Sequence, residues 1–423
     1  MPLMKWMGLL ALAMSTSLLA QEQVAAQRQR ELVINFAQQR QQQMLAAAKE
    51  QHLEVPKLFN ELFRAAIRYD WLATTNRYAE IRRGIAQYEG TRPDPKLNTE
   101  LWQYVLETFG AFEQVALWNP VILQRYEEEV IRPLTTNCIY FGGTDPGRFV
   151  PTVLRETSSK KFHVITQNAL ADGLYMTFLR KRSDASVLLP TPEQANEAFR
   201  KYVEDVQAGR IQAGADVKIE NGRVVVQGIG GVMAINGILA KWVFDKNKDK
   251  HDFFIEESYV LPWMYPYLVP AGVILKLEKE PLPKPQENGK FWTNILYQDS
   301  TFWAQLLGEF NTHPEFKTDY VAQRAFSKLR CAIAGIYEFR GIVKAAESAY
   351  QQAIAICPAS PEASFRLANL YMRLNRADDA IKTLQKLSEL DPTNAQVREA
   401  INQFEEFQRA SKKPTTDNKA PLK

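Results

Sequence analysis

CAIAGIYEFRGIVKAAESAYQQAIAICP (residues 331–358) and FRLANLYMRLNRADDAIKTLQKLSELDP (residues 365–392) decide the fold of the C-terminal third of this chain. Both segments end in proline, and Pro392 follows Pro358 by 34 residues. When the prolines are aligned, small and large side chains recur in the same order at helical spacing, so the segments are an internal repeat. The matched pairs are Ile333/Leu367, Ala334/Ala368, Tyr337/Tyr371, Ala346/Ala380, Tyr350/Leu384 and Ala353/Leu387.

The period and the packing order resemble the tetratricopeptide repeat, in which each unit is a pair of antiparallel helices. The resemblance implies two repeats and a capping helix within residues 318–410, followed by a disordered tail over residues 411–423. Because stacked repeats of this kind usually number at least about three, we expect the pair to pack on the neighbouring α/β domain. The repeats would offer a groove to a protein or peptide partner.

The composition of the 423-residue chain is that of an ordinary globular protein. Hydrophobic residues make up 46% and charged residues 24% of the chain, and the mean hydropathy is −0.31. These values exclude a wholly disordered chain, a collagen, a coiled-coil rod and a polytopic membrane protein. The net charge is only +4, so the sequence predicts no nucleic-acid partner.

The N-terminal segment MPLMKWMGLLALAMSTSLLA (residues 1–20) has the order of a secretory signal: Lys5, an apolar run, and then small residues. The apolar run is shorter than the roughly 20 residues that span a bilayer. We expect cleavage after Ala20 or after Ala26. The alternative is an uncleaved anchor, which is the one case in which we expect association with a membrane. In both cases the folded part is expected in the periplasm or outside the cell.

Three further regions are distinguished by the spacing of their hydrophobic residues or by their proline content. Residues 27–135 repeat apolar side chains at helical spacing, which predicts a helical region. Residues 137–280 alternate short apolar strands with helices and contain an Asn-Gly hairpin turn, which predicts an α/β domain with a parallel or mixed sheet. Residues 281–317 begin with PLPKPQ and are expected to be a linker and connecting segment. The predicted fold class is therefore α+β, with several domains.

Two polar loops follow the first two predicted strands, and the ends of parallel strands are where ligands bind in open α/β sheets. The loops are GGTDPGRF (residues 142–149) and TQNALAD (residues 166–172). A guanidinium holds phosphate or carboxylate groups, and amides and hydroxyls bind sugars. The alternative is that Asp145-Pro146-Gly147 forms a turn and that Asn168 caps a helix. The candidate ligand-binding residues are Asp145, Arg148, Thr166, Gln167, Asn168 and Asp172.

The uncharged segment SYVLPWMYPYLVPAGVIL (residues 258–275) is long enough to span a membrane, but its three prolines would each break a helix. We therefore expect a buried strand and an aromatic-lined turn. The alternative is that Trp263 and Tyr265 present flat faces for stacking on a sugar.

Motifs for catalysis and for metal binding are missing from the sequence. No two of the four histidines have metal-ligand spacing, and the sequence has no GxSxG, CxxC, HExxH or P-loop motif. We therefore assign no catalytic residue and expect no metal and no other cofactor. The sequence leaves open a disulfide between Cys331 and Cys357, which fall where antiparallel repeat helices end.

Several motifs in order over residues 137–405 resemble a known bacterial family. GGTDPGRFVPT, ITQNALADGLYM, VEDVQAGRI, IENGRVVVQGIGGVMAINGILA and EESYVLPWMYPYLVPAGVILKL are similar to the soluble C-terminal region of multi-pass membrane proteins of unknown function. That family is named for its similarity to protein O-mannosyltransferases, and its members carry appended tetratricopeptide repeats. The membrane part in which such transferases keep their catalytic carboxylates is not matched here, so the resemblance implies an accessory domain and not a transferase.

These observations predict an extracytoplasmic binding or scaffold protein. It would use the repeats for protein partners and would be accessory to envelope or protein glycosylation, with a glycan as a candidate ligand. The alternative is an enzyme, or an enzyme subunit, that acts on a glycan or a phosphorylated ligand at the strand ends.

Overall fold

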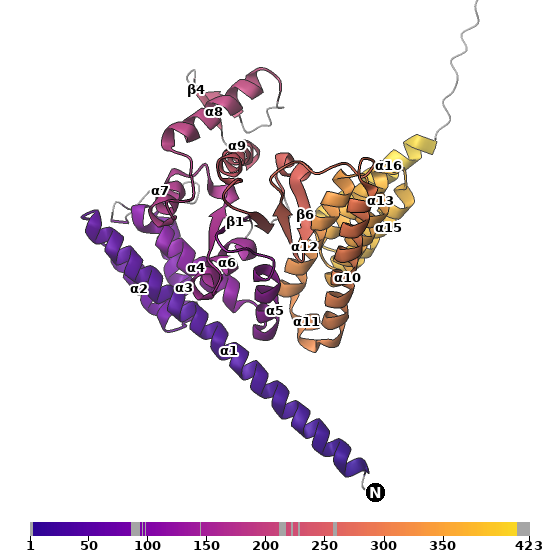
Figure 1. The fold of residues 1–423 in the computed structure, drawn as a ribbon, viewed down its shortest axis with the longest axis horizontal. Helices are drawn as coiled ribbons and strands as arrows, with labels where there is room; N and C mark the ends of the chain where they lie inside the picture. Colours follow the sequence, from indigo (N-terminus) through magenta and orange to yellow (C-terminus); the bar gives the residue numbers. More distant parts are fainter. Residues whose placement is uncertain are drawn as a thin grey trace, which may run out of the picture. The chain divides into compact units, whose positions relative to one another are not determined.

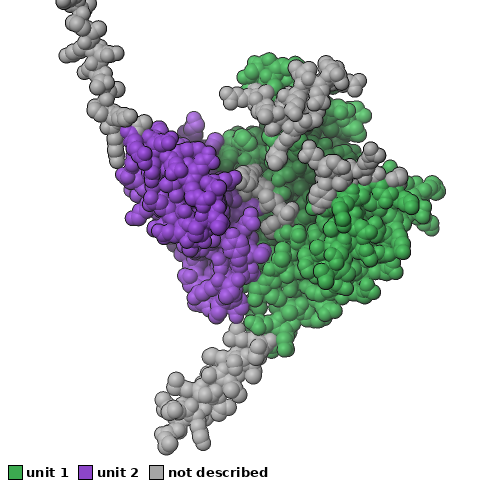
Figure 2. All heavy atoms as spheres, turned by 180° about the vertical axis from the view of Figure 1, so that it is seen from behind, with its two compact units in different colours: residues 1–282 green, residues 283–423 purple. Residues whose placement is uncertain are grey.

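The chain forms two compact units, residues 1–282 and residues 283–423, which are described separately (Figures 1 and 2). The structure is a computed structural model. It describes residues 3–85, 94, 96–97, 99–143, 145–210, 217–220, 223–226, 229–256 and 260–412. Of the tail expected over residues 411–423, residues 411 and 412 belong to the last helix, and residues 413–423 lie outside the described ranges.

The first unit begins with helices and continues with a small sheet that further helices accompany (Figure 1). Its helices are α1 (Leu3–Glu50), α2 (Lys57–Ile67), α3 (Trp71–Gly84), α4 (Trp102–Ala116), α5 (Pro120–Ile131), α6 (Asp145–Thr157), α7 (Gly173–Arg182), α8 (Pro192–Gln207) and α9 (Ile229–Asn247). Its strands are β1 (Cys138–Gly142), β2 (Phe162–Thr166), β3 (Val217–Glu220), β4 (Arg223–Val226), β5 (Phe253–Glu256), β6 (Leu268–Ala271) and β7 (Ile274–Leu277). Short 3₁₀ helices lie at Thr99–Leu101, Gln167–Ala169 and Pro262–Tyr267.

The N-terminal helices share one apolar core, as the helical spacing of their hydrophobic residues predicts. Phe59 and Phe63 of α2 are fully buried in it, and Tyr78 of α3 stacks on Trp102 and Phe109 of α4. Burial of aromatic side chains contributes about 25 cal/mol for each Å² of apolar surface removed from water, so this core orders the first four helices. The helix α3 is not anticipated from the sequence.

A buried ionic cluster joins four helices of this unit. The Arg40 side chain of α1 is 1% exposed, and its Nε donates to Glu107 Oε2 of α4 at 2.6 Å. Its Nη2 lies 3.2 Å from Glu156 Oε1 of α6, which also accepts from Arg182 Nη2 of α7 at 3.4 Å. Burial alone would raise the pKa of the Glu156 carboxyl, but Arg40 and a hydrogen bond from Gln39 hold that pKa below its usual value. Glu156 is therefore charged at neutral pH.

The central sheet is mixed, as predicted, with strand order β2-β1-β5-β7-β6. The strands β2, β1 and β5 are parallel, whereas β7 pairs antiparallel with β5 and with β6. The predicted hairpin is a separate two-stranded sheet of β3 and β4. In the parallel part, Gly142 at the end of β1 is in register with Thr166 of β2 and with Glu256 of β5. Three strands therefore end at the same edge of the sheet.

The proline-containing segment is not a single helix, in agreement with the sequence prediction. A 3₁₀ helix over Pro262–Tyr267 leads into β6, which contains Pro270 and lies at the edge of the sheet. Proline has no N–H group to donate to a neighbouring strand, so an edge position is the one that tolerates it.

The second unit contains the two predicted repeats. The first repeat is α12 (Tyr320–Phe339) with α13 (Val343–Ile356), the second is α14 (Pro361–Arg373) with α15 (Ala377–Leu390), and α16 (Ala395–Lys412) follows as the cap. Gly341 and Asn375 occupy equivalent turns, and both have a left-handed backbone, with φ of 70° and 58°. Glycine adopts this conformation without steric cost, and asparagine tolerates it better than most residues. Glycine and asparagine are therefore well suited to the turns between the two helices of each repeat.

The segment 281–317 differs from its predicted role as a linker, because α10 (Gly289–Thr312) and α11 (Pro314–Thr318) occupy most of it. Asp299 of α10 accepts two hydrogen bonds from Arg330 Nη1 of α12, at 2.7 and 3.0 Å, and both side chains are almost fully buried. Trp303 of α10 is also buried, with the Arg330 guanidinium 4.9 Å from its ring centroid. The helix α10 therefore packs beside the first repeat and forms part of the same unit.

The cysteines of the repeats do not form the disulfide that the sequence left open. Cys331 and Cys357 are both buried free thiols. Burial raises the pKa of both thiols, so neither is present as the reactive thiolate at neutral pH.

Replacement of Arg40 by methionine tests the ionic cluster. Arg40→Met leaves the carboxylates of Glu107 and Glu156 without their shared cation, and breaking a buried ion pair in this way costs about 3–5 kcal/mol. Arg77→Met is the matched control, because Arg77 is 43% exposed and pairs with Glu61 on the surface. The control is expected to cost less than about 1 kcal/mol. The free energies of unfolding come from urea titrations, and equal losses in the two variants would contradict a central role for the cluster.

Candidate functional site

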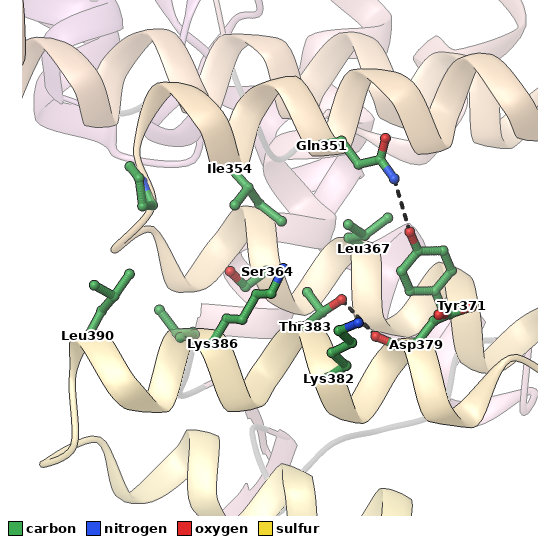
Figure 3. Close-up of a pocket in the computed structure, with 12 residues that line it drawn as sticks. Gln351, Ile354, Ser364, Leu367, Tyr371, Asp379, Lys382, Thr383, Lys386 and Leu390 are labelled. Carbon is green, nitrogen blue, oxygen red and sulfur yellow. Dashed lines mark hydrogen bonds between the residues drawn. The ribbon is translucent and has the colours of Figure 1, made fainter.

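A groove on the repeats lies between α13 and α15, with α14 as its floor (Figure 3). Its volume is about 400 Å³. The lining side chains come from the second helix of each repeat and from the first helix of the second repeat, so the groove exists only because the repeats stack. The lining residues are Gln351, Ile354, Pro358, Ser364, Leu367, Tyr371, Asp379, Lys382, Thr383, Lys386, Leu387 and Leu390.

The floor of the groove is apolar. Leu367 of α14 and Leu387 of α15 are buried, and both belong to the repeating pattern that the sequence shows. Ile354 of α13 is half-buried, and Leu390 at the end of α15 is 57% exposed. Ile354 and Leu390 therefore present apolar surface to a partner, while Leu367 and Leu387 hold the repeat core together.

The polar groups at one end of the groove are already paired with each other. Tyr371 donates its hydroxyl hydrogen to Glu347 Oε1 at 2.9 Å. It accepts a hydrogen bond from Gln351 Nε2 at 3.2 Å (Figure 3). Arg376 bridges Glu347 at 3.0 Å and Asp379 at 2.6 Å. Burial raises the pKa of the Tyr371 phenol, which therefore stays neutral and fixes the geometry of this end.

Lys382 and Lys386 lie on the α15 wall of the groove (Figure 3). They are four residues apart, so they are neighbours on one face of the helix. Both are exposed, and neither ammonium group makes an ion pair within residues 260–412. The groove therefore combines an apolar floor with two cationic groups that are available to a partner.

A second depression of about 500 Å³ lies between α14 and α16. Phe365 is its one aromatic side chain, and the rest of the lining is mostly polar. The lining residues are Phe365, Asn369, Gln396, Glu399, Ala400 and Gln403. This lining offers less apolar surface than the groove between α13 and α15.

The predicted strand-end loops do leave the sheet at one edge. Because β1 and β2 are parallel and Gly142 is in register with Thr166, the loops 142–149 and 166–172 begin side by side. Thr166 and Gln167 are buried there. Neither the amide nitrogen nor the amide oxygen of Gln167 has a hydrogen-bond partner in the described ranges. A buried amide without partners is unusual, so Gln167 has unused hydrogen-bonding capacity at this edge of the sheet.

The other residues of the two loops have structural contacts. The Asp172 carboxylate caps α7 by accepting from the backbone N–H groups of Leu174 and Tyr175. The backbone carbonyl oxygen of Asn168 accepts a hydrogen bond from Asn236 Nδ2 at 2.8 Å. The residue that caps α7 is therefore Asp172, and not Asn168, for which the sequence left a capping role open.

Arg148 is half-buried, and its guanidinium lies 4.6 Å from the Phe149 ring centroid and 5.7 Å from that of Tyr175. Asp145 begins α6, and the position of its side chain lies outside what the structure describes. A cationic group is therefore present near the strand ends, but its contacts are with aromatic rings.

The glycines of the first loop have a packing role. A Cβ atom at Gly147 would overlap the Glu256 carboxylate, and a Cβ atom at Gly142 would overlap the backbone oxygen of Gly147. The Glu256 side chain, which is fully buried, therefore lies against the first turn of α6. Negative charge is stabilised at a helix N-terminus, so an acid of the protein itself occupies the place that an anionic ligand would take.

The aromatic residues proposed for sugar stacking are both half-buried. The Trp263 ring lies 5.4 Å from that of Phe244 and 6.4 Å from that of Tyr267, measured between centroids. Lys241 Nζ lies 5.6 Å from the Trp263 ring centroid. Tyr265 lies in the same 3₁₀ helix. Trp263 is therefore packed among other side chains and is only partly available to a ligand.

The described residues hold no group of three or more His, Cys, Asp or Glu side chains placed to bind a metal ion. None of the helices in the described ranges combines the length and the apolar character needed to cross a membrane.

Comparison with known proteins identifies the repeats. The family profile described as tetratricopeptide repeat matches residues 341–404, which covers α13, α14, α15 and most of α16. A search of curated protein sequences found no match to the chain. The repeats indicate a scaffold for protein–protein interaction, and the groove between α13 and α15 lies within the matched segment.

The unpaired amide of Gln167 leads to a prediction about stability. Gln167→Met is expected to raise the free energy of unfolding by about 1–3 kcal/mol, because an amide buried without partners no longer has to be desolvated. Gln29→Met is the matched control, since Gln29 Nε2 donates to the carbonyl oxygens of Val115 and Trp118 at 2.6 and 2.9 Å. In Gln29→Met the free energy of unfolding is expected to fall by about 1–3 kcal/mol, because the two carbonyl oxygens lose their donor. Urea denaturation measures the free energy of unfolding of both variants. A large decrease in Gln167→Met would show that this amide makes a structural contact.

Proposed function

We propose that the chain is an extracytoplasmic scaffold whose repeats bind a protein partner and that it is accessory to envelope or protein glycosylation. The observation that carries the binding part is the groove between α13 and α15, in the segment matched by the tetratricopeptide repeat profile. The extracytoplasmic part rests on the signal-like order of residues 1–20. The link to glycosylation rests on the motifs between residues 137 and 405 that resemble the mannosyltransferase-like family.

A second candidate function is the binding of a glycan or a phosphorylated ligand at the strand ends of the first unit. Gln167 supports it, because this buried amide lacks hydrogen-bond partners in the described ranges and lies where three parallel strands end. The capping role of Asp172 and the position of Glu256 against α6 leave fewer free groups at this edge than the sequence suggested. The scaffold function is therefore the one that the geometry supports best.

Affinity purification of the tagged full chain from its native host tests the proposal. We expect the mature protein in the periplasmic or extracellular fraction, beginning at Gln21 or Gln27, together with a specific envelope protein. Leu390→Asp places a charge on the exposed apolar rim of the groove and is expected to reduce recovery of that protein about tenfold or more. Leu117→Asp is the control, because Leu117 is 49% exposed and belongs to the first unit.

Three outcomes would contradict the proposal. A full-length cytosolic product would contradict the expected compartment. Equal recovery of the partner by Leu390→Asp and by the wild-type chain would place the interaction outside the groove. Loss of the gene without any change in glycosylation of envelope proteins, measured by glycoproteomics, would remove the link to glycosylation.

A further inference from the structure

We propose that the groove between α13 and α15 selects a short partner segment in which aliphatic side chains alternate with aspartate or glutamate. This inference rests on the proposed scaffold function and specifies the chemistry of its partner. The aliphatic side chains would cover the apolar floor, and the acidic ones would pair with Lys382 and Lys386.

The charge balance of the groove favours an acidic partner. Asp379 is the single acidic residue in the lining, and Arg376 already holds its carboxylate at 2.6 Å. Glu347, the next carboxylate at this end, is held by the same guanidinium at 3.0 Å and accepts from Tyr371 at 2.9 Å. Both carboxylates beside the groove are therefore already paired with Arg376, and with Lys382 and Lys386 included this set of five side chains carries a net charge of +1. The ammonium groups of Lys382 and Lys386 are the charges that remain for a partner.

The arrangement of the two lysines limits the shape of that partner. One helical turn separates them along α15, so their Cβ atoms lie about 5–6 Å apart. Acidic residues at alternate positions of an extended segment are spaced about 6.6 Å apart, and those four apart on a helix have the spacing of the lysines themselves. In an extended segment the side chain between two acids points away from the lysines and toward the α13 wall of the groove, where Ile354 lies (Figure 3).

The chain's own C-terminal tail does not have this chemistry. Residues 413–423 read KPTTDNKAPLK, with three lysines and one aspartate. Its net positive charge would be repelled by Lys382 and Lys386, and leucine is its only large aliphatic residue. A separate protein segment with acidic and aliphatic residues is therefore the occupant that fits the groove.

Peptide selection on the full-length chain tests the inference while the partner itself is still unidentified. The probe is a random library of 12-residue peptides displayed on phage. Enriched peptides are synthesised with a fluorescein label, and fluorescence anisotropy gives their dissociation constants. We expect the enriched sequences to combine Leu, Ile or Met with at least two acidic residues, and we expect salt to weaken their binding.

Charge reversal locates the binding site. The K382E/K386E variant is expected to bind the enriched peptides at least about tenfold more weakly, because like charges then face each other. The control K317E/K344E makes the same change in net charge at two exposed lysines outside the groove, and its affinity is expected to stay within about twofold of wild type. Thermal unfolding followed by circular dichroism checks that both variants remain folded.

The outcomes separate this inference from the proposed function. Enriched peptides that lack acidic residues, or that bind K382E/K386E as well as wild type while Leu390→Asp weakens them, would overturn the acidic specificity and leave the scaffold function intact. A library from which nothing is enriched would contradict both. A concentration-dependent dimer that disappears in K382E/K386E, detected by light scattering, would show that a second copy of the chain occupies the groove and would also overturn the inference.

Discussion

Close packing of helices at alanine residues is the constraint on which the repeat module depends. Ala334 of α12, Ala346 of α13, Ala368 of α14 and Ala380 of α15 are fully buried. A larger side chain at any of them would push neighbouring helices apart, and overpacking of a core typically costs about 1–3 kcal/mol. The small residues therefore fix where α13, α14 and α15 lie relative to each other, and with them the width of the groove.

The groove follows from this packing because α14 separates the second helices of the two repeats. Residues of α13 and α15 that face away from the core, such as Ile354 and Lys386, become the walls of a common surface (Figure 3). The same helices therefore supply stability through their alanines and recognition through their outward side chains. Changes at Lys382 or Lys386 can alter the partner without disturbing the core, because both residues are exposed.

The sequence predicts the features that have a local or periodic signal. The 34-residue period reveals the repeats, and short apolar runs that alternate with helices reveal the parallel strands. The helix α10 is not predicted from the sequence, because it lies outside the 34-residue repeat and follows the proline-rich start of segment 281–317. A strand within residues 258–275 is expected from the sequence, but its position at β6 is not, because Pro270 is unfavourable inside a sheet and is acceptable only at the edge.

Features that depend on distant contacts have no signal in the sequence. Arg40 is joined in the ionic cluster to Glu107 and Glu156, which lie 67 and 116 positions away in the sequence. Asp172 is equally suited by sequence to a cap and to a ligand site, and only its hydrogen bonds to the first turn of α7 decide between them. Lys382 and Lys386 resemble every other surface lysine until the pairing of the neighbouring acids is known.

Photo-crosslinking in living cells of the native host tests most directly whether the groove is the binding surface. A photoreactive amino acid placed at position 386 of the full chain should form a specific crosslink to one envelope protein. The same amino acid at position 344, exposed on α13 outside the groove, should not. Crosslinks of equal yield at both positions, or a crosslink at position 167 and none at 386, would contradict the account and would move the functional surface away from the groove.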